Sequence, residues 1–223
     1  MEDPTAPRSR RAIVFAGGES PLPSNRGVLD GDIVIAADSG LETAVGLGIS
    51  VDVVVGDMDS VSATSLERAI AAGTIAERHA TEKDATDLEL ALMRALAEGA
   101  TDVVVVGGFG GRLDHLLANA LLLAAAELSS ASITWYVGDT SVAVARPGAP
   151  VEVIGEPGDL LSILPIGGAG DGIRTEGLRW ALTGDTLGPG STKGVSNELT
   201  ESRASIEVET GVLLVVHERS SPT

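Results

Sequence analysis

Two aspartates one residue apart, Asp57 and Asp59, directly follow an apolar run in the segment "VDVVVGDMDSV". Their side chains would share one face if strand geometry persists past Gly56. Close carboxylates repel each other unless a cation lies between them, so the pair predicts a bound metal or a raised pKa. For either aspartate alone, a loop residue that caps the following helix is the simpler interpretation. For the pair beside Asp38, which follows another apolar run, we favour a metal site.

A second acidic segment, "EKDATDLEL", contributes Asp84 and Asp87 beside Lys83. Aspartates at the N-cap and third position of a helix need no functional explanation, because both positions favour acidic residues. Lys83 is harder to explain, since the chain has two lysines against thirteen arginines. An ammonium group beside a metal site can hold polyphosphate, whereas a solvated surface lysine is the structural alternative.

The segment "GGFGGRLDH" combines glycines, including Gly110 and Gly111, with Arg112 at the start of a predicted helix. Free N–H groups at a helix N-terminus attract anions, and Arg112 could bind a phosphate through two hydrogen bonds. The segment does not match G-x-x-x-x-G-K-[ST], so alone it is weak evidence. His115 is either a base or, more simply, a helix-start histidine bonded to a neighbouring carbonyl.

The second half holds the segment "GLRWALTGDTLGPGSTKGVSNEL". In this polar, turn-rich context the ring of Trp180 could stack on a cationic heteroaromatic ligand, although a tryptophan can also be core filler. The run "SNE", which begins at Ser196, offers a hydroxyl, an amide and a carboxylate to the edge of a nitrogen heterocycle. Taken alone, this run could equally be a turn.

Alternating strands and helices must position these residues over the first 145 positions. Continuous apolar runs predict strands covered on both faces at 12–16, 33–37, 51–55 and 102–106. Helical spacing predicts helices at 40–47, 62–72, 85–98 and 114–128. The clearest helix begins with Asp84 as N-cap and has Gly99 just past its end. This alternation predicts an α/β fold with a doubly wound, mostly parallel sheet, whose ligands bind beyond the carboxyl ends of the strands.

From residue 146 onward, Pro- and Gly-rich turns separate short strands at 151–154, 160–165, 173–180, 204–209 and 212–217. The last two are expected to form a hairpin that turns at Thr210 and Gly211. The sequence therefore predicts an α/β domain over 1–145 and a C-terminal antiparallel β-sandwich domain over 146–223.

Composition limits the partners and the cofactors. The net charge of −17 would repel nucleic acid and anionic membrane surfaces. With no cysteine and three histidines, a metal must bind mainly through carboxylates, which favours Mg²⁺ over zinc. The polar N-terminus does not look like a signal peptide, and the apolar run 116–126 is too short to cross a bilayer. We expect a soluble, cytoplasmic protein with no membrane segment.

The ordered set "AADSG", "GDMDS", "KDATDLELAL", "GGRLDHLLANALLL" and "LRWALTGDTL…TKGVSNE" resembles the thiamine pyrophosphokinase, or thiamine diphosphokinase, family over residues 13–217. The resemblance implies an α/β catalytic domain followed by a β-sandwich domain. It also implies a homodimer that binds thiamine near the subunit interface. The implied reaction transfers a pyrophosphoryl group from ATP, the co-substrate, to the primary alcohol of thiamine, giving thiamine diphosphate and AMP.

The resemblance also implies roles for individual residues. Positions that match the metal and catalytic aspartates are Asp38, Asp57, Asp59, Asp84 and Asp87. From the general chemistry of phosphoryl transfer we expect Asp57, Asp59 and Asp87 to hold one or two Mg²⁺ ions, and Asp38 or Asp84 to orient or deprotonate the thiamine hydroxyl. The nucleotide-binding part would comprise Lys83, Thr86, Gly110, Gly111, Arg112, Asp114 and His115. The thiamine-binding part would comprise Trp180, Ser196 and Asn197.

One loop departs from the family, because "ADSGLE" replaces a pattern closer to "ADGGAN" and so introduces Ser39 and Glu42. Three other functions remain open: a pyrophosphokinase for a hydroxymethylpterin alcohol, a non-catalytic module that binds thiamine or a nucleotide, and a Mg²⁺ phosphatase. The "W…SNE" segment favours thiamine over a pterin. It also speaks against a phosphatase, in which Trp180 and "SNE" would have no role. The intact acidic set speaks against a silent module.

Overall fold

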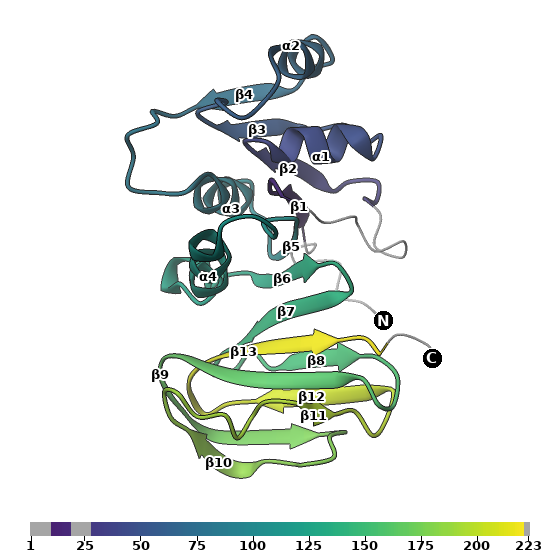
Figure 1. The fold of residues 1–223 in the computed structure, drawn as a ribbon, viewed down its shortest axis with the longest axis vertical. Helices are drawn as coiled ribbons and strands as arrows, with labels where there is room; N and C mark the ends of the chain where they lie inside the picture. The colour runs from purple at the N-terminus through teal and green to yellow at the C-terminus, as the bar shows by residue number, and fades with distance from the viewer. Residues whose placement is uncertain (1–9, 19–27, 221–223) are drawn as a thin grey trace, which may run out of the picture. The chain divides into compact units, whose positions relative to one another are not determined.

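A computed structural model describes residues 10–18 and 28–220, which form two compact units (Figure 1). The first unit takes in the chain up to Arg112 together with Ser130–Ser132, and the second takes in Leu113–Ser129 and the chain from Ile133 onward. The N-terminal segment without signal-peptide character lies outside the described residues, as do Glu19 and Ser20 after the first strand. The predicted domain boundary at 145/146 stays a prediction.

Over residues 10–18 and 28–112, the first unit contains five parallel strands in the order β4-β3-β2-β1-β5. Their bounds are β1 (Arg11–Phe15), β2 (Ile33–Ala37), β3 (Val53–Gly56), β4 (Ile75–Arg78) and β5 (Asp102–Val106). Apart from the first residue of β1 and of β5, strands β1, β2, β3 and β5 are buried along their length, which confirms the prediction from their continuous apolar runs. Strand β4 was not predicted, because "IAER" lies half exposed at the sheet edge and carries no apolar run.

From β2 onward, three helices connect these strands: α1 (Gly40–Gly46), α2 (Ala63–Ala71) and α3 (Asp87–Ala97). Helix α3 buries the predicted apolar stripe, including Leu88 and Leu92. The predicted N-cap Asp84 is wrong, because α3 begins three residues later, where the Oγ1 of Thr86 accepts a hydrogen bond from the backbone N–H of Glu89 at 3.2 Å. Threonine and aspartate are both good N-caps, so the sequence alone did not separate them.

In the second unit, helix α4 (Leu113–Leu122) is shorter than the predicted helix 114–128 and is followed by a 3₁₀ turn at Ala126–Leu128. The carbonyls of Leu123 and Ala125 accept hydrogen bonds from Nη2 of Arg146, at 3.2 and 2.9 Å, instead of continuing the helical ladder. Among the described residues, no helix is long and apolar enough to cross a membrane.

The rest of the second unit is antiparallel. Its strands are β6 (Ser132–Val137), β7 (Thr140–Ala145), β8 (Val151–Ile154), β9 (Leu160–Glu176), β10 (Thr183–Leu187), β11 (Asn197–Glu198), β12 (Arg203–Glu207) and β13 (Thr210–Glu218). One layer runs β6-β7-β13-β9, and the other joins β8, β12 and β10 to the second half of β9. Leu161 and Val215 of the first layer share a buried core with Ile173 and Ile206 of the second. The predicted β-sandwich is therefore present.

Strand β9 serves both layers, and this changes two predictions. The separate strands expected at 160–165 and 173–180 form one strand, which ends at Glu176 and passes between layers at its glycine-rich middle. The predicted hairpin at 204–217 is wrong, because β12 pairs with β8 and β9 whereas β13 pairs with β7 and β9. Turn residues between two apolar runs do not reveal whether the second run folds back on the first or joins another layer.

Candidate active site

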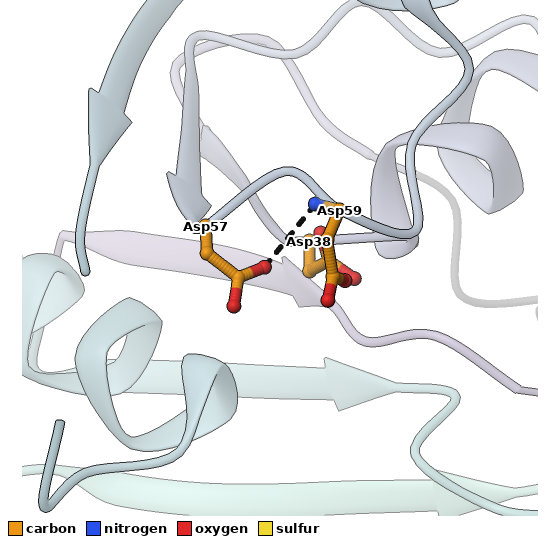
Figure 2. A group of neighbouring side chains, drawn as sticks. All are labelled: Asp38, Asp57 and Asp59. Atoms are coloured by element: carbon orange, nitrogen blue, oxygen red, sulfur yellow. Dashed lines mark hydrogen bonds between the residues drawn. The ribbon is translucent and has the colours of Figure 1, made fainter. Parts of the chain in front are cut away.

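Three carboxylates meet where two neighbouring parallel strands of the first unit end. Asp38 follows β2, and Asp57 and Asp59 follow β3, whose ends are in register at Ala37 and Val55. Each aspartate offers one oxygen, and these oxygens lie within 4.8 Å of one another (Figure 2). The sequence-based prediction that Asp38 lies beside the Asp57–Asp59 pair thus matches the geometry.

A tight turn, and not a continued strand, brings Asp57 and Asp59 together. Strand β3 ends at Gly56, and Met58 between the two aspartates adopts a left-handed backbone with φ of 65°. The condition that strand geometry persists past Gly56 therefore fails. The backbone N–H of Asp59 instead donates to Oδ1 of Asp57 at 3.2 Å (Figure 2). Asp38 is also left-handed, with φ of 45°, and such backbone conformations in residues other than glycine concentrate at functional sites.

Gly56 makes room for the acidic residues around it. A Cβ at this position would lie 2.9 Å from Oδ1 of Asp87 and 3.2 Å from Cβ of Asp38. Asp87 is the first residue of α3, so the helix start brings a fourth carboxylate to the same place. Gly56 was not among the predicted site residues, although a glycine immediately before "DMD" is a signal that backbone and carboxylates approach closely.

Lys83 is the cation of this cluster. Its Nζ lies 2.9 Å from Oδ1 of Asp87 and 3.8 Å from Oδ2 of Asp57. The short contact with the Asp87 carboxylate raises the pKa of Lys83, which keeps the side chain charged. Among the described residues, Oδ1 of Asp87 and Oδ1 of Asp38 are buried oxygens without a hydrogen-bond partner, so Lys83 contacts Asp87 as an ion pair.

The carboxylates differ in their electrostatic surroundings. Burial raises the pKa of Asp38, which is 9% exposed, and the nearby charges of Asp87 and Asp59 raise it further, against hydrogen bonds from Ser39 and Ser60. The N–H of Asp59 and, to a smaller degree, the charge of Lys83 lower the pKa of Asp57. The pKa of Asp38 is therefore shifted up and that of Asp57 down, so Asp38 binds a proton more readily than Asp57 does.

The donor set fits a hard divalent cation. A buried oxygen without a partner is costly unless a ligand satisfies it, and among the described residues Oδ1 of Asp38 is such an oxygen in this cluster. All the donors are carboxylate oxygens, which Mg²⁺ prefers. The group within 4.8 Å contains Asp38 where we expected Asp87, which instead contacts Lys83.

The two residues that depart from the family pattern have local structural partners. Glu42, on α1, accepts hydrogen bonds from the N–H of Ser62 at 3.0 Å and the hydroxyl of Ser65 at 2.9 Å. It therefore caps the start of α2 together with Ser62. Ser39 directs its Oγ to the place that a Cβ on Gly17 would occupy, so it packs against the end of β1.

The glycine-rich ends of β1 and β5 contact each other. The N–H of Gly108 donates to the carbonyl of Gly17 at 2.7 Å, and a Cβ on Gly107 would lie 2.3 Å from the carbonyl of Ala16. These glycines allow two loops to pack closely. Gly110, Gly111 and Arg112 follow them at the end of the first unit.

Other predicted site residues do not belong to the three-aspartate group. Asp84 is exposed and outside the three-aspartate group, and the side chain of Thr86 is used as the cap of α3. Asp114 and His115 begin α4 in the second unit, where the carboxylate of Asp114 accepts a hydrogen bond from the N–H of His115 at 3.0 Å.

The residues predicted to bind thiamine gather on the second unit. The ring of Trp180 is 55% exposed, and the guanidinium carbon of Arg179 lies 5.1 Å from its centroid. Ser196 is exposed, with a left-handed backbone at φ of 60°, and its N–H donates to Oγ of Ser162. Asn197 is buried and makes hydrogen bonds to the backbone of Trp180.

The chain thus joins a parallel α/β unit that carries carboxylates at its strand ends to an antiparallel β-sandwich unit that exposes a tryptophan. Family models then give two consecutive matches: "Thiamin pyrophosphokinase, catalytic domain" over residues 28–135 and "Thiamin pyrophosphokinase, vitamin B1 binding domain" over residues 151–213. The chain belongs to the thiamine pyrophosphokinase family.

Thiamine pyrophosphokinases of known sequence and structure match the chain over nearly its whole length. A thiamine pyrophosphokinase of Bacillus subtilis (strain 168) is 28% identical over 205 residues, which is 92% of this chain and 96% of the relative. The crystal structure of a B. subtilis thiamine pyrophosphokinase matches 95% of this chain and 100% of its own, with a TM-score of 0.83 and 26% identity. A family protein from Enterococcus faecalis matches 96% and 100%, with a TM-score of 0.79 and 26% identity.

Proposed function

We propose that the chain transfers a pyrophosphoryl group from ATP to the primary alcohol of thiamine, which yields thiamine diphosphate and AMP. The observation that supports this most is the meeting of Asp38, Asp57 and Asp59 within 4.8 Å, with a buried and unpartnered oxygen on Asp38. The family matches support pyrophosphoryl transfer and thiamine as the acceptor, because one matched region is a pyrophosphokinase catalytic domain and the other a vitamin B1 binding domain.

The proposed step forms one bond and breaks one. The hydroxyl oxygen of thiamine attacks the β-phosphorus of ATP, the bond between that phosphorus and the oxygen bridging to the α-phosphorus breaks, and AMP leaves with the bridging oxygen. The hydroxyl proton passes to a carboxylate. Asp38 suits this role better than Asp84, because Asp38 lies within the cluster and burial raises its pKa, whereas Asp84 is exposed outside it.

Asp57 and Asp59 would hold Mg²⁺, with Asp38 in the same group of carboxylates and Asp87 nearby at Gly56. When bound, Mg²⁺ neutralises phosphate charge and makes the phosphorus easier to attack. The protein contributes position, since the left-handed Met58 and the absence of a side chain at Gly56 keep the carboxylates close.

Charged groups beside the cluster would orient the nucleotide. The ammonium of Lys83, already paired with Asp87 and Asp57, is placed to contact a phosphate that approaches the same carboxylates. Arg112 and the glycines before it are candidates for the remaining phosphates. Because ATP binds with its cation and thiamine is itself cationic, a net charge of −17 does not oppose either substrate.

On the second unit, we propose that Trp180 and Ser196 contact thiamine. The exposed ring of Trp180 offers a flat surface to a heteroaromatic ring, and the exposed hydroxyl of Ser196 offers a donor and an acceptor to its edge. A homodimer and a cytoplasmic location are further predictions, which the resemblance and the composition support.

Product analysis tests the proposal. The purified chain is incubated with ATP, Mg²⁺ and thiamine, and the products are separated by chromatography. AMP and thiamine diphosphate in equal amounts are expected. ADP with thiamine monophosphate would rule out pyrophosphoryl transfer. Turnover of a hydroxymethylpterin in place of thiamine would move the assignment to a pterin pyrophosphokinase, and binding without turnover would indicate a non-catalytic module.

A further inference from the structure

The side-chain amide of Asn197 makes hydrogen bonds to both the backbone N–H and the backbone carbonyl of Trp180. Its Oδ1 accepts a hydrogen bond from the N–H of Trp180 at 3.0 Å, and its Nδ2 donates to the carbonyl of Trp180 at 2.8 Å. The same Oδ1 accepts a third hydrogen bond, from the N–H of Glu198 at 2.9 Å. Asn197 is 7% exposed, so these bonds are shielded from water.

Neighbouring contacts hold the same two segments together. The N–H of Arg179 donates to the carbonyl of Glu198 at 2.9 Å, and Nη1 of Arg179 lies 2.7 Å from Oε2 of Glu198. One residue further out on each segment, Leu178 and Leu199 form an antiparallel bridge, and both side chains are buried. Trp180 thus combines an exposed ring with a backbone that is fixed at its N–H and its carbonyl.

This geometry leaves Asn197 little capacity to contact a ligand. Both lone pairs of its oxygen are used, and one of its two amide hydrogens is used, so a single N–H remains on a buried side chain. Ser196 beside it is exposed, in a strained left-handed conformation, and its hydroxyl is the nearer candidate for a direct contact.

We propose that Asn197 is a positioning residue, which acts on thiamine binding through Trp180 and does not itself touch the substrate. The inference rests on the proposed function, because it takes Trp180 as the stacking surface for thiamine. Among the described residues, Trp180 belongs to no strand, since it lies after β9 and before β10, so its bonds to Asn197 are what fix its own backbone. A stacking ring on such a segment binds well only if its backbone is held in place before the ligand arrives.

A double-mutant cycle separates positioning from direct contact. The KM for thiamine and kcat are measured for the wild type, Asn197→Ala, Trp180→Ala and the double variant. We expect each single variant to raise KM about tenfold or more, with a smaller change in kcat. Asn197→Ala loses two hydrogen bonds to the backbone of Trp180, and Trp180→Ala loses the stacking ring itself. In the double variant we expect no further rise beyond Trp180→Ala. Independent, multiplying effects would show that Asn197 contacts thiamine directly and would overturn the inference.

A second readout does not depend on turnover. ¹⁹F NMR of protein labelled with 5-fluorotryptophan gives one signal for Trp180, assigned by its loss in Trp180→Ala, and one for the buried Trp135. Without thiamine, Asn197→Ala and the near-isosteric Asn197→Asp should shift and narrow the Trp180 signal and leave the Trp135 signal in place. An unchanged Trp180 signal in both variants would overturn the inference even if KM rises.

Thr175→Val is the matched control. Oγ1 of Thr175 accepts a hydrogen bond from the N–H of Leu182 at 2.9 Å, so this variant also removes a buried side-chain-to-backbone bond near the same segment. It should lower the melting temperature without moving the thiamine KM or the Trp180 signal. If Trp180→Ala leaves KM unchanged, the proposed role of Trp180 fails. If Trp180→Ala raises KM while the Asn197 variants do not, the positioning role alone fails.

Discussion

Replacement of Gly56 by alanine tests whether the carboxylates around it do the chemistry. The new Cβ would lie 2.9 Å from Oδ1 of Asp87, 3.1 Å from its Cγ and 3.2 Å from Cβ of Asp38. Ordinary contacts begin near 3.4 Å, so the carboxylates must move by a few tenths of an ångström. The backbone φ of 145° adds strain of about 1–3 kcal/mol, because residues with a Cβ rarely adopt it.

Gly73→Ala is the control for backbone strain. Gly73 follows α2 in the same unit with φ of 109°, and a Cβ there would meet no described atom within 4 Å. Both variants should therefore lose about 1–3 kcal/mol in the free energy of unfolding, measured with urea. Only Gly56→Ala should also lower kcat about a hundredfold and raise the Mg²⁺ concentration needed for half-maximal rate, since displaced carboxylates misplace the reacting groups. Equal kcat of folded Gly56→Ala and Gly73→Ala would show that the carboxylates around Gly56 do not take part in the reaction.

Three further predictions concern single side chains. Burial acts to raise the pKa of Asp159, but hydrogen bonds from two backbone N–H groups and from His217, at 2.9 Å, lower it overall. Its stabilisation is therefore complete above the unfolded pKa near 4 and is lost as the pH falls through the lower folded value. The gap in melting temperature between wild type and Asp159→Asn should shrink from pH 7 to pH 3, and a constant gap would contradict this. Arg146→Met should cost about 1–3 kcal/mol in urea unfolding, because the carbonyls that Arg146 satisfies after α4 lose their donor. Without nucleotide, Lys83→Met should bind Mg²⁺ about tenfold more tightly, because a competing cation is removed from the carboxylates. It should bind ATP more weakly, because a phosphate contact is lost. Isothermal titration calorimetry measures both affinities, and an unchanged Mg²⁺ affinity would count against this role of Lys83.

The sequence was informative where one physical requirement dominated. Strands β2 and β5 lie at the predicted positions, because a strand buried on both faces needs a continuous apolar run. Strand β4 gave no such signal, since its side chains face partly into solvent. The path of β9 through both layers depends on contacts with β12 and β13 far along the chain, which local pattern cannot specify.

The candidate site was predictable in its residue types but not in its geometry. Because parallel strands end at one edge of a sheet, the sequence indicated that Asp38 and Asp57 meet there. The turn at Met58, the room at Gly56 and the contact of Asp87 with Lys83 depend on backbone angles and packing. The same limit applies to Asn197, whose amide is equally suited to a ligand or to the backbone of Trp180 until its neighbours are known.

The most direct test of the acidic cluster follows the reaction by ³¹P NMR with the wild type, Asp57→Asn and Asp59→Asn in parallel, at limiting Mg²⁺. Circular dichroism and melting temperature first establish that all three proteins are folded. We expect the wild type to convert ATP and thiamine to AMP and thiamine diphosphate. We expect the rate of both variants to fall at least about a hundredfold. Wild-type turnover by folded Asp59→Asn would contradict the proposed metal site, because the carboxylate of Asp59 would then have no part in the transfer.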